Sequence, residues 1–423
     1  MRAMKDSGIE WVGQIPQTWD TQKLKFLVGL RTEKTADKTV LSPYVGLEHV
    51  VSSTGTLIED YEAILDFAGD TLDYKKGDVL FGKLRPYLAK AIQAETDGRC
   101  SSEFWVMDPH SINGRFLLYA VLSHGFISCI DQSTFGVKMP RAEWEYAGNQ
   151  ELALPDSDTQ CRIAYYLDAK CADIDALITA KEKTNALLKE RRQSIIYEAV
   201  TKGLNPDALM KDSGIEWIGQ IPEYWDVAAL KRVATPSTGA TPSKANPQYW
   251  EGDIPWFSSK DIKSDYLFDS EDHISQQAVE ECGLTVHDEN SVIICARSGI
   301  LRHTFPVSVL KCKGTINQDL RVLETSAAID PEFLMYYLHG MNNTIVTLYQ
   351  KVGATVESIE MEWLLYLPVA LPPVEEQKQI ADYIVARCNE IDGQIAANEV
   401  SVTKLKEYRQ SIIYEAVTGK IEV

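Results

Sequence analysis

The chain has 423 residues, of which 45% are hydrophobic and 24% charged, so it is long enough for two hydrophobic cores and has the composition of folded domains. Its net charge of −19 argues against nucleic-acid binding over the whole surface, because phosphate binding depends on Lys and Arg. The eight cysteines form no C-x-x-C pair, and no apolar run approaches the roughly 20 residues that span a bilayer. We therefore expect free thiols, no membrane segment and a cytoplasmic location.

Two stretches of the sequence occur twice. MKDSGIEWVGQIP at Met4–Pro16 returns with a single change at Met210–Pro222, and RQSIIYEAVT at Arg192–Thr201 returns unchanged at Arg409–Thr418. The chain therefore consists of two copies of one unit, roughly residues 1–203 and 204–423, with repeated ends and unlike middles. We expect the identical ends to meet identical partners and the unlike middles to meet different targets.

The two middles, about Lys23–Asn149 and Leu230–Leu365, are predicted to be mixed α/β domains. Short runs of β-forming residues alternate with Gly, Pro and Asn turns, and apolar residues recur at helical spacing in Arg115–His124 and Pro331–Met341. The clearest predicted strands lie in Asp78–Gly82, Glu103–Met107 and Ser291–Cys295. Each middle ends in a Leu-Pro corner, after which the hydrophobic period changes.

Beyond each corner, apolar residues fall on steps of three and four, which predicts two helices of about 40 residues, each about 60 Å long. We expect these helices to pack against each other in antiparallel fashion, with a parallel homodimeric zipper as the competing arrangement. Polar residues at seam positions would help to fix the register; these are Lys181, Asn185, Arg192, Asn398 and Arg409. The predicted α/β domains are residues 1–155 and 204–372, and the predicted long helices are residues 156–203 and 373–423.

Three windows of the acidic chain contain basic residues and no Asp or Glu, namely Val79–Ala94, Gln132–Ala142 and Asn290–Gln318. Such windows indicate local anion-binding surfaces, although solvated loops are the alternative. The candidate DNA-binding residues are Lys83, Arg85, Lys138 and Arg141 in the first middle, and Lys260, Arg297, Arg302, His303 and Lys351 in the second. Gly136 and Gly353 lie next to two of these positions and would let the backbone approach a phosphate closely.

The repeated ends also carry aromatic residues. The candidate partner-interface residues are Trp11, Ile15, Trp217 and Ile221 in the openings, and Tyr197 and Tyr414 in the helix ends. Core packing is the alternative for the openings, and a place in the helix seam is the alternative for the two tyrosines. Base stacking is disfavoured, because variable sequence follows each opening at once.

Nothing in the sequence predicts catalysis or a metal site. A phosphate loop of the form G-x-x-x-x-G-K-[ST] is absent, and Asn246–Tyr249 lacks the second proline of the N-P-P-Y segment of adenine methyltransferases. Pro155–Asp156 with Asp168–Lys170 fits a nuclease pattern formally, but its second copy has lost every carboxylate. The seven histidines are scattered without metal-ligand spacing.

The chain resembles the specificity subunit of type I restriction-modification systems over nearly its whole length. The resemblance rests on the G-I-E-W-[VI]-G-x-I-P-x-x-W openings at Gly8–Trp19 and Gly214–Trp225, and on LPPVEEQKQIADYI after the second corner. GDVLFGKLRPYLAK at Gly77–Lys90, GTINQDLRVL at Gly314–Leu323 and the R-Q-S-I-I-Y-E-A-V-T helix ends add to it. The order of these motifs, found twice, is more specific than any single motif.

This resemblance implies that each middle is a target recognition domain for one half of a bipartite double-stranded DNA site, and that the long helices hold the halves at a fixed separation. It implies two modification subunits that methylate adenine and two restriction subunits that translocate and cut DNA. S-adenosylmethionine, ATP and Mg²⁺ are expected in those partners, and no cofactor is expected in this chain. The remaining alternative is a coiled-coil protein-interaction scaffold without sequence-specific DNA binding, which the acidic net charge supports.

Overall fold

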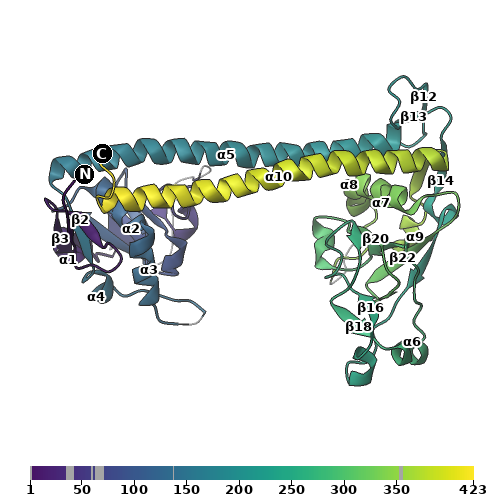
Figure 1. The fold of residues 1–423 in the computed structure, drawn as a ribbon, viewed down its shortest axis with the longest axis horizontal. Coiled ribbons are helices and arrows are strands. Elements are labelled where there is room, and N and C mark those ends of the chain that lie inside the picture. Colours follow the sequence, from purple (N-terminus) through teal and green to yellow (C-terminus); the bar gives the residue numbers. More distant parts are fainter. Residues whose placement is uncertain (1, 35–41, 59–60, 62–70, 137, 352–355) are drawn as a thin grey trace. The chain divides into compact units, whose positions relative to one another are not determined.

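The computed structural model describes residues 2–34, 42–58, 61, 71–136, 138–351 and 356–423. The chain folds into two compact units, the first formed by Met1–Lys183 with Asn398–Val423 and the second by Thr184–Ala397. Each unit holds one α/β domain, one copy of the repeated opening and about half of each long helix. These helices are α5 (Ser157–Lys202) and α10 (Val374–Val417), drawn in teal and yellow in Figure 1.

The first unit contains two larger antiparallel or mixed sheets and two small strand pairs. Its strands are β1 (Met4–Asp6), β2 (Gln14–Pro16), β3 (Asp20–Lys23), β4 (Val28–Arg31), β5 (Tyr44–Val45), β6 (Thr71–Tyr74), β7 (Val79–Gly82), β8 (Ala91–Gln93), β9 (Gly98–Ser101), β10 (Phe104–Pro109) and β11 (Glu151–Leu154). The four-stranded sheet has the order β4-β10-β7-β8 and the three-stranded sheet the order β5-β9-β6. The opening forms the β1-β2 hairpin, and β3 pairs with β11.

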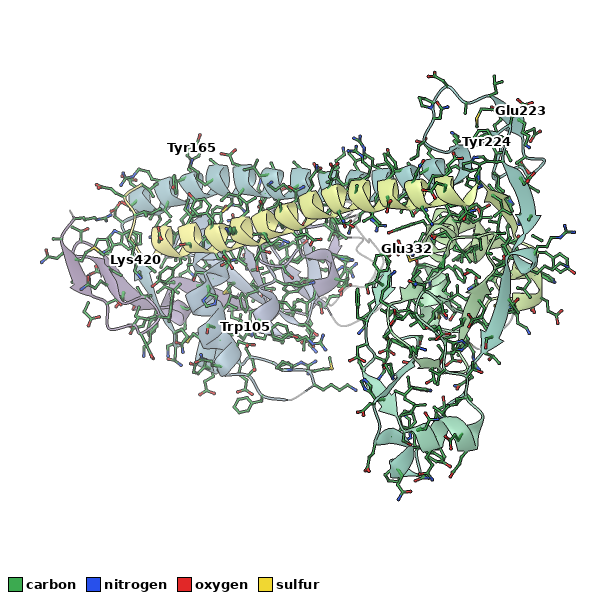
Figure 2. All side chains as sticks on the ribbon, turned by 45° about the vertical axis from the view of Figure 1, so that its right-hand side comes forward. Trp105, Tyr165, Glu223, Tyr224, Glu332 and Lys420 are labelled. Atoms are coloured by element: carbon green, nitrogen blue, oxygen red, sulfur yellow. The ribbon has the colours of Figure 1, made fainter. Side chains whose placement is uncertain are left out.

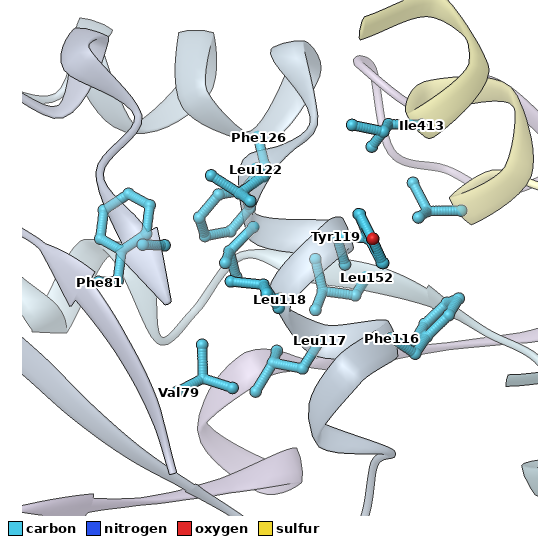
Figure 3. Close-up of a cluster of buried hydrophobic side chains, with 14 of the residues drawn as sticks. Val79, Phe81, Phe116, Leu117, Leu118, Tyr119, Leu122, Phe126, Leu152 and Ile413 are labelled. Atoms are coloured by element: carbon cyan, nitrogen blue, oxygen red, sulfur yellow. The ribbon is translucent and has the colours of Figure 1, made fainter. Parts of the chain in front are cut away.

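The helices of the first unit cover the four-stranded sheet and supply its core. They are α1 (Leu24–Leu27), α2 (Gly114–Leu122), α3 (His124–Gln132) and α4 (Trp144–Ala147), besides the first part of α5 and the last part of α10. Figure 3 shows Leu117 and Leu118 of α2 on the side of Val79 and Phe81 of β7, and all four side chains are fully buried. Trp105 of β10, labelled in Figure 2, stacks on Phe81 with ring centroids 5.5 Å apart.

The second unit repeats this plan, and its larger sheet has five strands where that of the first unit has four. Its strands are β12 (Met210–Asp212), β13 (Gln220–Pro222), β14 (Asp226–Ala229), β15 (Ala234–Thr238), β16 (Ile254–Phe257), β17 (Tyr266–Leu267), β18 (Asp272–Ile274), β19 (Val292–Cys295), β20 (Val307–Leu310), β21 (Thr315–Ile316), β22 (Leu320–Thr325) and β23 (Pro368–Leu371). Its sheet orders are β15-β22-β19-β20-β17 and β18-β16-β21, with the pairs β12-β13 and β14-β23. Its short helices are α6 (Gln276–Cys282), α7 (Pro331–Gly340), α8 (Asn342–Leu348) and α9 (Met361–Leu364).

Each long helix is tied to the α/β domain of its unit by a glutamine near its start. Gln160 accepts a hydrogen bond from the Asn113 N–H at 2.7 Å and donates to the Pro155 carbonyl at 2.8 Å. Gln377 accepts from the Asp330 N–H at 2.7 Å and donates to the Pro372 carbonyl at 2.8 Å. Both glutamines are buried, so they satisfy backbone groups that water cannot reach. The Leu-Pro corners are therefore matching junctions in the two units.

The long helices run antiparallel within each unit, as the sequence predicts. In the first unit the Lys181 ammonium donates to Asn398 Oδ1 at 3.2 Å, and the Arg409 guanidinium donates to Asp175 at 2.9 Å. In the second unit Arg192 donates to Asp392 at 3.3 Å. Polar residues in the seam are thus paired across it. Toward the end of α5, Ile195 is half-buried and its neighbour Ile196 is fully buried, because the second α/β domain packs against that side of the helix.

The mixed α/β class, the internal repeat and the antiparallel helices are confirmed. Predicted helices at Arg115–His124 and Pro331–Met341 correspond to α2 and α7, and the three clearest predicted strands correspond to β7, β10 and β19. The two compact units divide each long helix between them, at Lys183 in α5 and at Ala397 in α10. In the part of the chain that the structure describes, no helix is long and apolar enough to cross a membrane.

Candidate DNA interface and hairpin clamps

The four basic candidates of the first domain lie on two neighbouring loops. Lys83 and Arg85 follow strand β7, and Lys138 and Arg141 belong to the loop between α3 and α4. The Arg85 N–H donates to the Pro140 carbonyl at 2.8 Å, and the Ala142 N–H donates to the Lys83 carbonyl at 2.9 Å. The sequence placed these residues in two separate windows, and the backbone bonds between the loops bring them to one surface.

Among the described residues of the same two loops, three exposed side chains are apolar, and sequence reasoning missed them. Phe135 is 72% exposed, Met139 53% and Tyr87 52%. Phe135 and Arg141 exchange two backbone hydrogen bonds of 3.2 Å, which close a tight loop carrying Lys138 and Met139 at its end. Exposed aromatic groups beside basic groups are typical of surfaces on which nucleic-acid bases stack. The sequence contained no signal for this exposure, since it depends on how the loop projects from the domain.

Four of the five candidates of the second domain gather at the matching place. Arg297, Arg302 and His303 follow strand β19, which corresponds to β7, and Lys351 begins the loop between α8 and α9. The Ile359 N–H donates to the Ala296 carbonyl at 2.8 Å, as Ala142 does to Lys83 in the first domain. The Lys351 N–H donates to the Ser358 carbonyl at 2.8 Å, which matches the bond from Phe135 to Arg141. Gly353 lies outside the described residues.

The two surfaces differ in how their cations are paired. In the second domain Arg302 is paired with Glu357, and Lys351 lies 3.7 Å from Glu360. The hydrogen bond from Arg302 lowers the pKa of the Glu357 carboxyl. In the first domain Arg141 is paired with Glu103 at 2.7 Å, whereas Lys83, Arg85 and Lys138 form no ion pair among the described residues. The first surface therefore presents more unneutralised positive charge.

Lys260 stands apart from the other candidates of the second domain. It follows strand β16, and its ammonium group lies 2.9 Å from Asp272 and 3.0 Å from Glu271. Hydrogen bonds to these two carboxylates raise the pKa of the Lys260 ammonium group. Two carboxylates of the same domain thus neutralise its charge, so Lys260 is the weakest of the nine DNA-binding candidates.

The repeated openings form two matching hairpins. Met4 pairs with Pro16 in the first, Met210 pairs with Pro222 in the second, and the register is the same throughout. At the turn, Ser7 and Ser213 each accept a hydrogen bond from the N–H two residues later, at 3.1 and 3.2 Å. Glycines with positive φ complete both turns, because this left-handed backbone region strains residues that carry a Cβ atom.

A tyrosine from a repeated helix end binds each hairpin. The Tyr414 hydroxyl donates to the Trp11 carbonyl at 3.1 Å, and the Tyr197 hydroxyl donates to the Trp217 carbonyl at 2.7 Å. We call each pair of hairpin and tyrosine a hairpin clamp. The two tyrosines therefore hold their hairpins and do not lie in the helix seam. Lys420, labelled in Figure 2, donates to the Tyr414 hydroxyl.

The structure corrects the place of two predicted partner-interface residues. Ile15 and Ile221 have no exposed surface and belong to the cores of their units, so their side chains do not contact a partner directly. Trp19 and Trp225, which follow the hairpins, are also fully buried. Trp11 and Trp217 are half-buried at the hairpin turns, so they and the edges of the clamps are the accessible part of the repeated openings.

The described residues contain no group of three or more His, Cys, Asp or Glu side chains placed to hold a metal ion. What they do present is a pair of unlike basic surfaces, each on its own α/β domain, together with two copies of one clamp. This arrangement defines a class of protein with two unlike α/β domains joined to a pair of duplicated long helices.

Comparisons with known proteins agree with that class. Residues 222–397 match the family model described as type I restriction modification DNA specificity domain. The chain is 28% identical to the Escherichia coli type I restriction enzyme EcoR124I/EcoR124II specificity subunit over 177 residues, which span 41% of each protein. It is 21% identical to the Methanocaldococcus jannaschii type I restriction enzyme MjaVIII specificity subunit over 97% of this chain and 94% of that protein.

Solved structures show the same fold. A chain from work on complex assembly and conformational transition of the type I R-M system aligns with a TM-score of 0.77 at 20% identity, over 96% of this chain and 99% of that chain. The HsdS subunit from Thermoanaerobacter tengcongensis aligns with a TM-score of 0.54 at 19% identity, over 96% and 98%. The chain is thus similar over nearly its whole length to a type I restriction enzyme specificity subunit, and its second half matches the DNA specificity domain of that class.

Proposed function

We propose that this chain is the non-catalytic specificity subunit of a type I restriction-modification complex, and that each α/β domain reads one half of a bipartite, asymmetric DNA site. The observation that carries this proposal is the pair of matching loop surfaces. They share backbone pairing but carry different side chains. Two unlike readers on one duplicated frame would select two unlike half-sites. The proposed recognition domains are residues 1–155 and 204–372.

Within this proposal, the loops after β7 and β19 and the loops before α4 and α9 contact the DNA. Arginine and lysine bind guanine edges or phosphates, and only the contacts to base edges carry sequence information. Arg85, Lys138 and Arg297 are the strongest candidates, because all three are exposed and none forms an ion pair among the described residues. Phe135 beside the first two would stack on a base or wedge between base steps.

The duplicated clamps would dock two copies of one partner, which we propose is the modification subunit that methylates adenine. Two restriction subunits would complete the complex, and S-adenosylmethionine, ATP and Mg²⁺ would bind to those partners. A pair of like partners requires two like docking surfaces, and the clamps match in register and in tyrosine contacts. The complex would act in the cytoplasm, on the DNA of the cell and on entering DNA.

The long helices are proposed to set the gap between the half-sites. Inserting one heptad after Lys183 and another after Ala397 would add seven residues to each helix and keep the apolar stripe in phase. Each helix would lengthen by about 10 Å, which corresponds to about three base pairs. The expected result is a methylated motif with unchanged halves and a longer gap. An unchanged gap would refute the spacer role.

A protein-interaction scaffold is the second candidate, and the net charge of −19 with the paired cations of the second domain favours it. The two functions differ in their response to salt. DNA affinity of the assembled complex should fall steeply as ionic strength rises, because bound phosphates release counterions, whereas a protein interface would respond less. Affinity for duplex DNA that is insensitive to salt and to sequence would favour the scaffold.

The direct test is a long-read map of methylated bases in the source genome, compared between the intact strain and a strain that lacks only this gene. Loss of adenine methylation at one split, asymmetric motif is the expected result. It would give both half-sites and the gap in one experiment. An unchanged map in a strain with active modification subunits would contradict the proposal.

A further inference from the structure

The first unit contains a cavity of about 1130 Å³ beside its hairpin clamp. One wall consists of repeated sequence, from Gly8–Trp11 of the opening and from Lys406–Tyr414 of α10. The other wall belongs to the non-repeated domain and is formed by α3, Tyr146 of α4 and residues Asn149–Glu151. All of these elements lie in the first unit. One wall of the cavity therefore consists of sequence that the second unit also contains, and the other wall consists of sequence found only in the first unit.

The charge lining this cavity is negative. Glu10, Glu151 and Glu407 line it, and none of the three forms an ion pair among the described residues. Lys406 also lines it, but its ammonium group is paired with Glu182 at 3.3 Å. Trp11, Tyr146 and Tyr414 supply aromatic surface in the same walls. Carboxylates together with aromatic faces form the usual environment for a guanidinium or ammonium group.

Two polar atoms in the cavity walls lack a hydrogen-bond partner among the described residues. Trp11 Nε1 and Gln410 Oε1 are both buried and unpaired. The second unit differs, because Gln193, the repeat counterpart of Gln410, donates to the His339 carbonyl at 2.8 Å. Both atoms are covered, so a ligand reaches them only when the side chains around them shift, and a ligand that offers an acceptor and a donor would then pair both. A peptide segment offers a backbone carbonyl and a basic side chain.

We propose that this cavity receives an arginine or lysine side chain from a segment of a protein partner. The volume exceeds what one side chain fills, so the neighbouring residues of the segment would enter with it. The cavity is continuous with the clamp, and the clamp is the proposed docking surface for the modification subunit. The inference therefore rests on the proposed function, and it assigns to one of the two bound partner copies a contact that the other lacks.

The repeat supplies a matched control for the test. Glu190 occupies in the second unit the place that Glu407 occupies in the first, within the shared sequence K-E-x-R-Q-S-I-I-Y, and both are exposed. The full-length chain and the variants E407K, E190K and S128W would each be titrated with the purified modification subunit by calorimetry. Mass photometry would count bound copies. Ser128 lies in the non-repeated wall, so S128W fills the cavity without touching the repeated text.

The wild-type chain should bind two modification subunits. E407K and S128W should each weaken one binding step by about tenfold or more while leaving the other unchanged, because a charge-assisted contact is lost at one site only. E190K should change either step less than threefold. All variants should keep the wild-type melting temperature.

Equal effects of E407K and E190K, or no effect of E407K and S128W, would overturn the cavity inference alone. Spermidine serves as a small-cation probe. If it binds the chain in a manner that E407K abolishes while partner affinity is unchanged, the cavity is a small-cation site and the inference is wrong. A wild-type chain that binds no modification subunit would overturn the cavity inference and the proposed docking role together.

Discussion

The two units use identical sequence at their ends and unlike sequence in their middles, and the two kinds of sequence preserve different features. The ends reproduce side-chain contacts, such as the bonds from Tyr414 to the Trp11 carbonyl and from Tyr197 to the Trp217 carbonyl. The middles reproduce mainly backbone pairing, such as the bonds that join Ala142 to Lys83 and Ile359 to Ala296. The backbone thus carries the shared scaffold, while the side chains of the middles carry the difference between two binding surfaces.

The largest expected effect concerns the tryptophans that follow the hairpins. Trp19 and Trp225 are both fully buried, so Trp19→Ala and Trp225→Ala should each lower the free energy of unfolding by about 3–5 kcal/mol. Urea denaturation followed by circular dichroism measures this. If the units are alike in their cores, the two losses should agree within about 1 kcal/mol. If only one of the two substitutions lowers the free energy of unfolding, the repeated sequence does not stabilise both units equally.

Arg409 and Arg192, which lie in the helix seam within identical sequence, should contribute differently to the free energy of unfolding. Arg409 is buried and donates to Asp175 at 2.9 Å and to the carbonyls of Ser53 and Thr54 at 2.6 and 2.9 Å. Arg192 is 28% exposed and lies 3.3 Å from Asp392. Arg409→Met should therefore cost about 2–4 kcal/mol of unfolding free energy, and Arg192→Met about 1 kcal/mol or less.

The measurement for this pair is again urea denaturation, with the wild-type chain run in parallel. Equal costs would mean that the loop at Ser53 does not depend on Arg409. The double variant should show additive costs, because the two arginines lie in different units and share no partner.

DNA affinity should distinguish the two binding surfaces. In the complex with the modification subunit, the double variant Arg85→Ala with Lys138→Ala should bind the cognate duplex about tenfold or more weakly. If both residues contact phosphates, the slope of log affinity against log salt should fall by about 2. Fluorescence anisotropy at several salt concentrations measures both quantities. The matched control is Arg302→Ala, whose effect should be smaller because Glu357 already neutralises that guanidinium.

A substitution of the carboxylate that pairs with Arg302 tests the same difference in DNA affinity from the other side of the ion pair. Glu357→Gln removes the carboxylate and frees the Arg302 charge, so affinity should rise by a few fold at low salt. An unchanged or weaker affinity would indicate that Glu357 positions Arg302 for a base contact and does more than neutralise it.

A smaller effect is expected on lowering the pH. Burial lowers the pKa of the His339 imidazole. The carboxylate of Asp265, 3.5 Å away, raises this pKa, but by less than burial lowers it. The unfolded chain therefore binds a proton near the ordinary pKa of about 6.5 that the folded chain does not bind, so the unfolding free energy should fall as the pH drops below that value. Between pH 7 and 5.5 the loss should be about 1 kcal/mol larger for the wild type than for His339→Gln.

The first unit supplies the contrast for this prediction. Leu122 follows the helix cap Asn113 at the spacing at which His339 follows Asp330, and it is fully buried. Leu122→Met should leave the pH dependence of the unfolding free energy unchanged. Urea denaturation at several pH values checks both variants. Identical pH profiles for the wild type and His339→Gln would contradict the assignment to this histidine.

The sequence could predict the features that depend on local pattern. The internal repeat, the α/β class, the long helices and the polar seam positions follow from repeated text and from hydrophobic period. The partners of those seam residues could not be predicted: the contact of Arg409 with Ser53 joins positions far apart in the chain. The Tyr414 clamp was missed for the same reason, since its hydroxyl meets a carbonyl of the opposite end of the sequence.

The sequence could predict which residue types form the candidate site, but not whether each cation is paired or each side chain is exposed. Acid-free windows identified Lys83, Arg85 and Arg302, and the structure brings the two windows of the first domain together. Whether a cation is neutralised depends on carboxylates that are remote in sequence, as Glu357 is from Arg302. Exposure of Phe135 likewise follows from the loop that carries it. Charge pairing and exposure are tertiary properties, so a single sequence does not encode them in any short window.

The most direct test is a domain duplication. Residues 23–149 of the first middle would be replaced by a copy of residues 230–365, and the methylated motif would be mapped in a strain that carries this chain as its only specificity subunit. Two identical readers on the duplicated frame should methylate a symmetric motif whose two halves both match the second half of the native site. A motif that keeps the native first half would contradict the division of the site between the two domains.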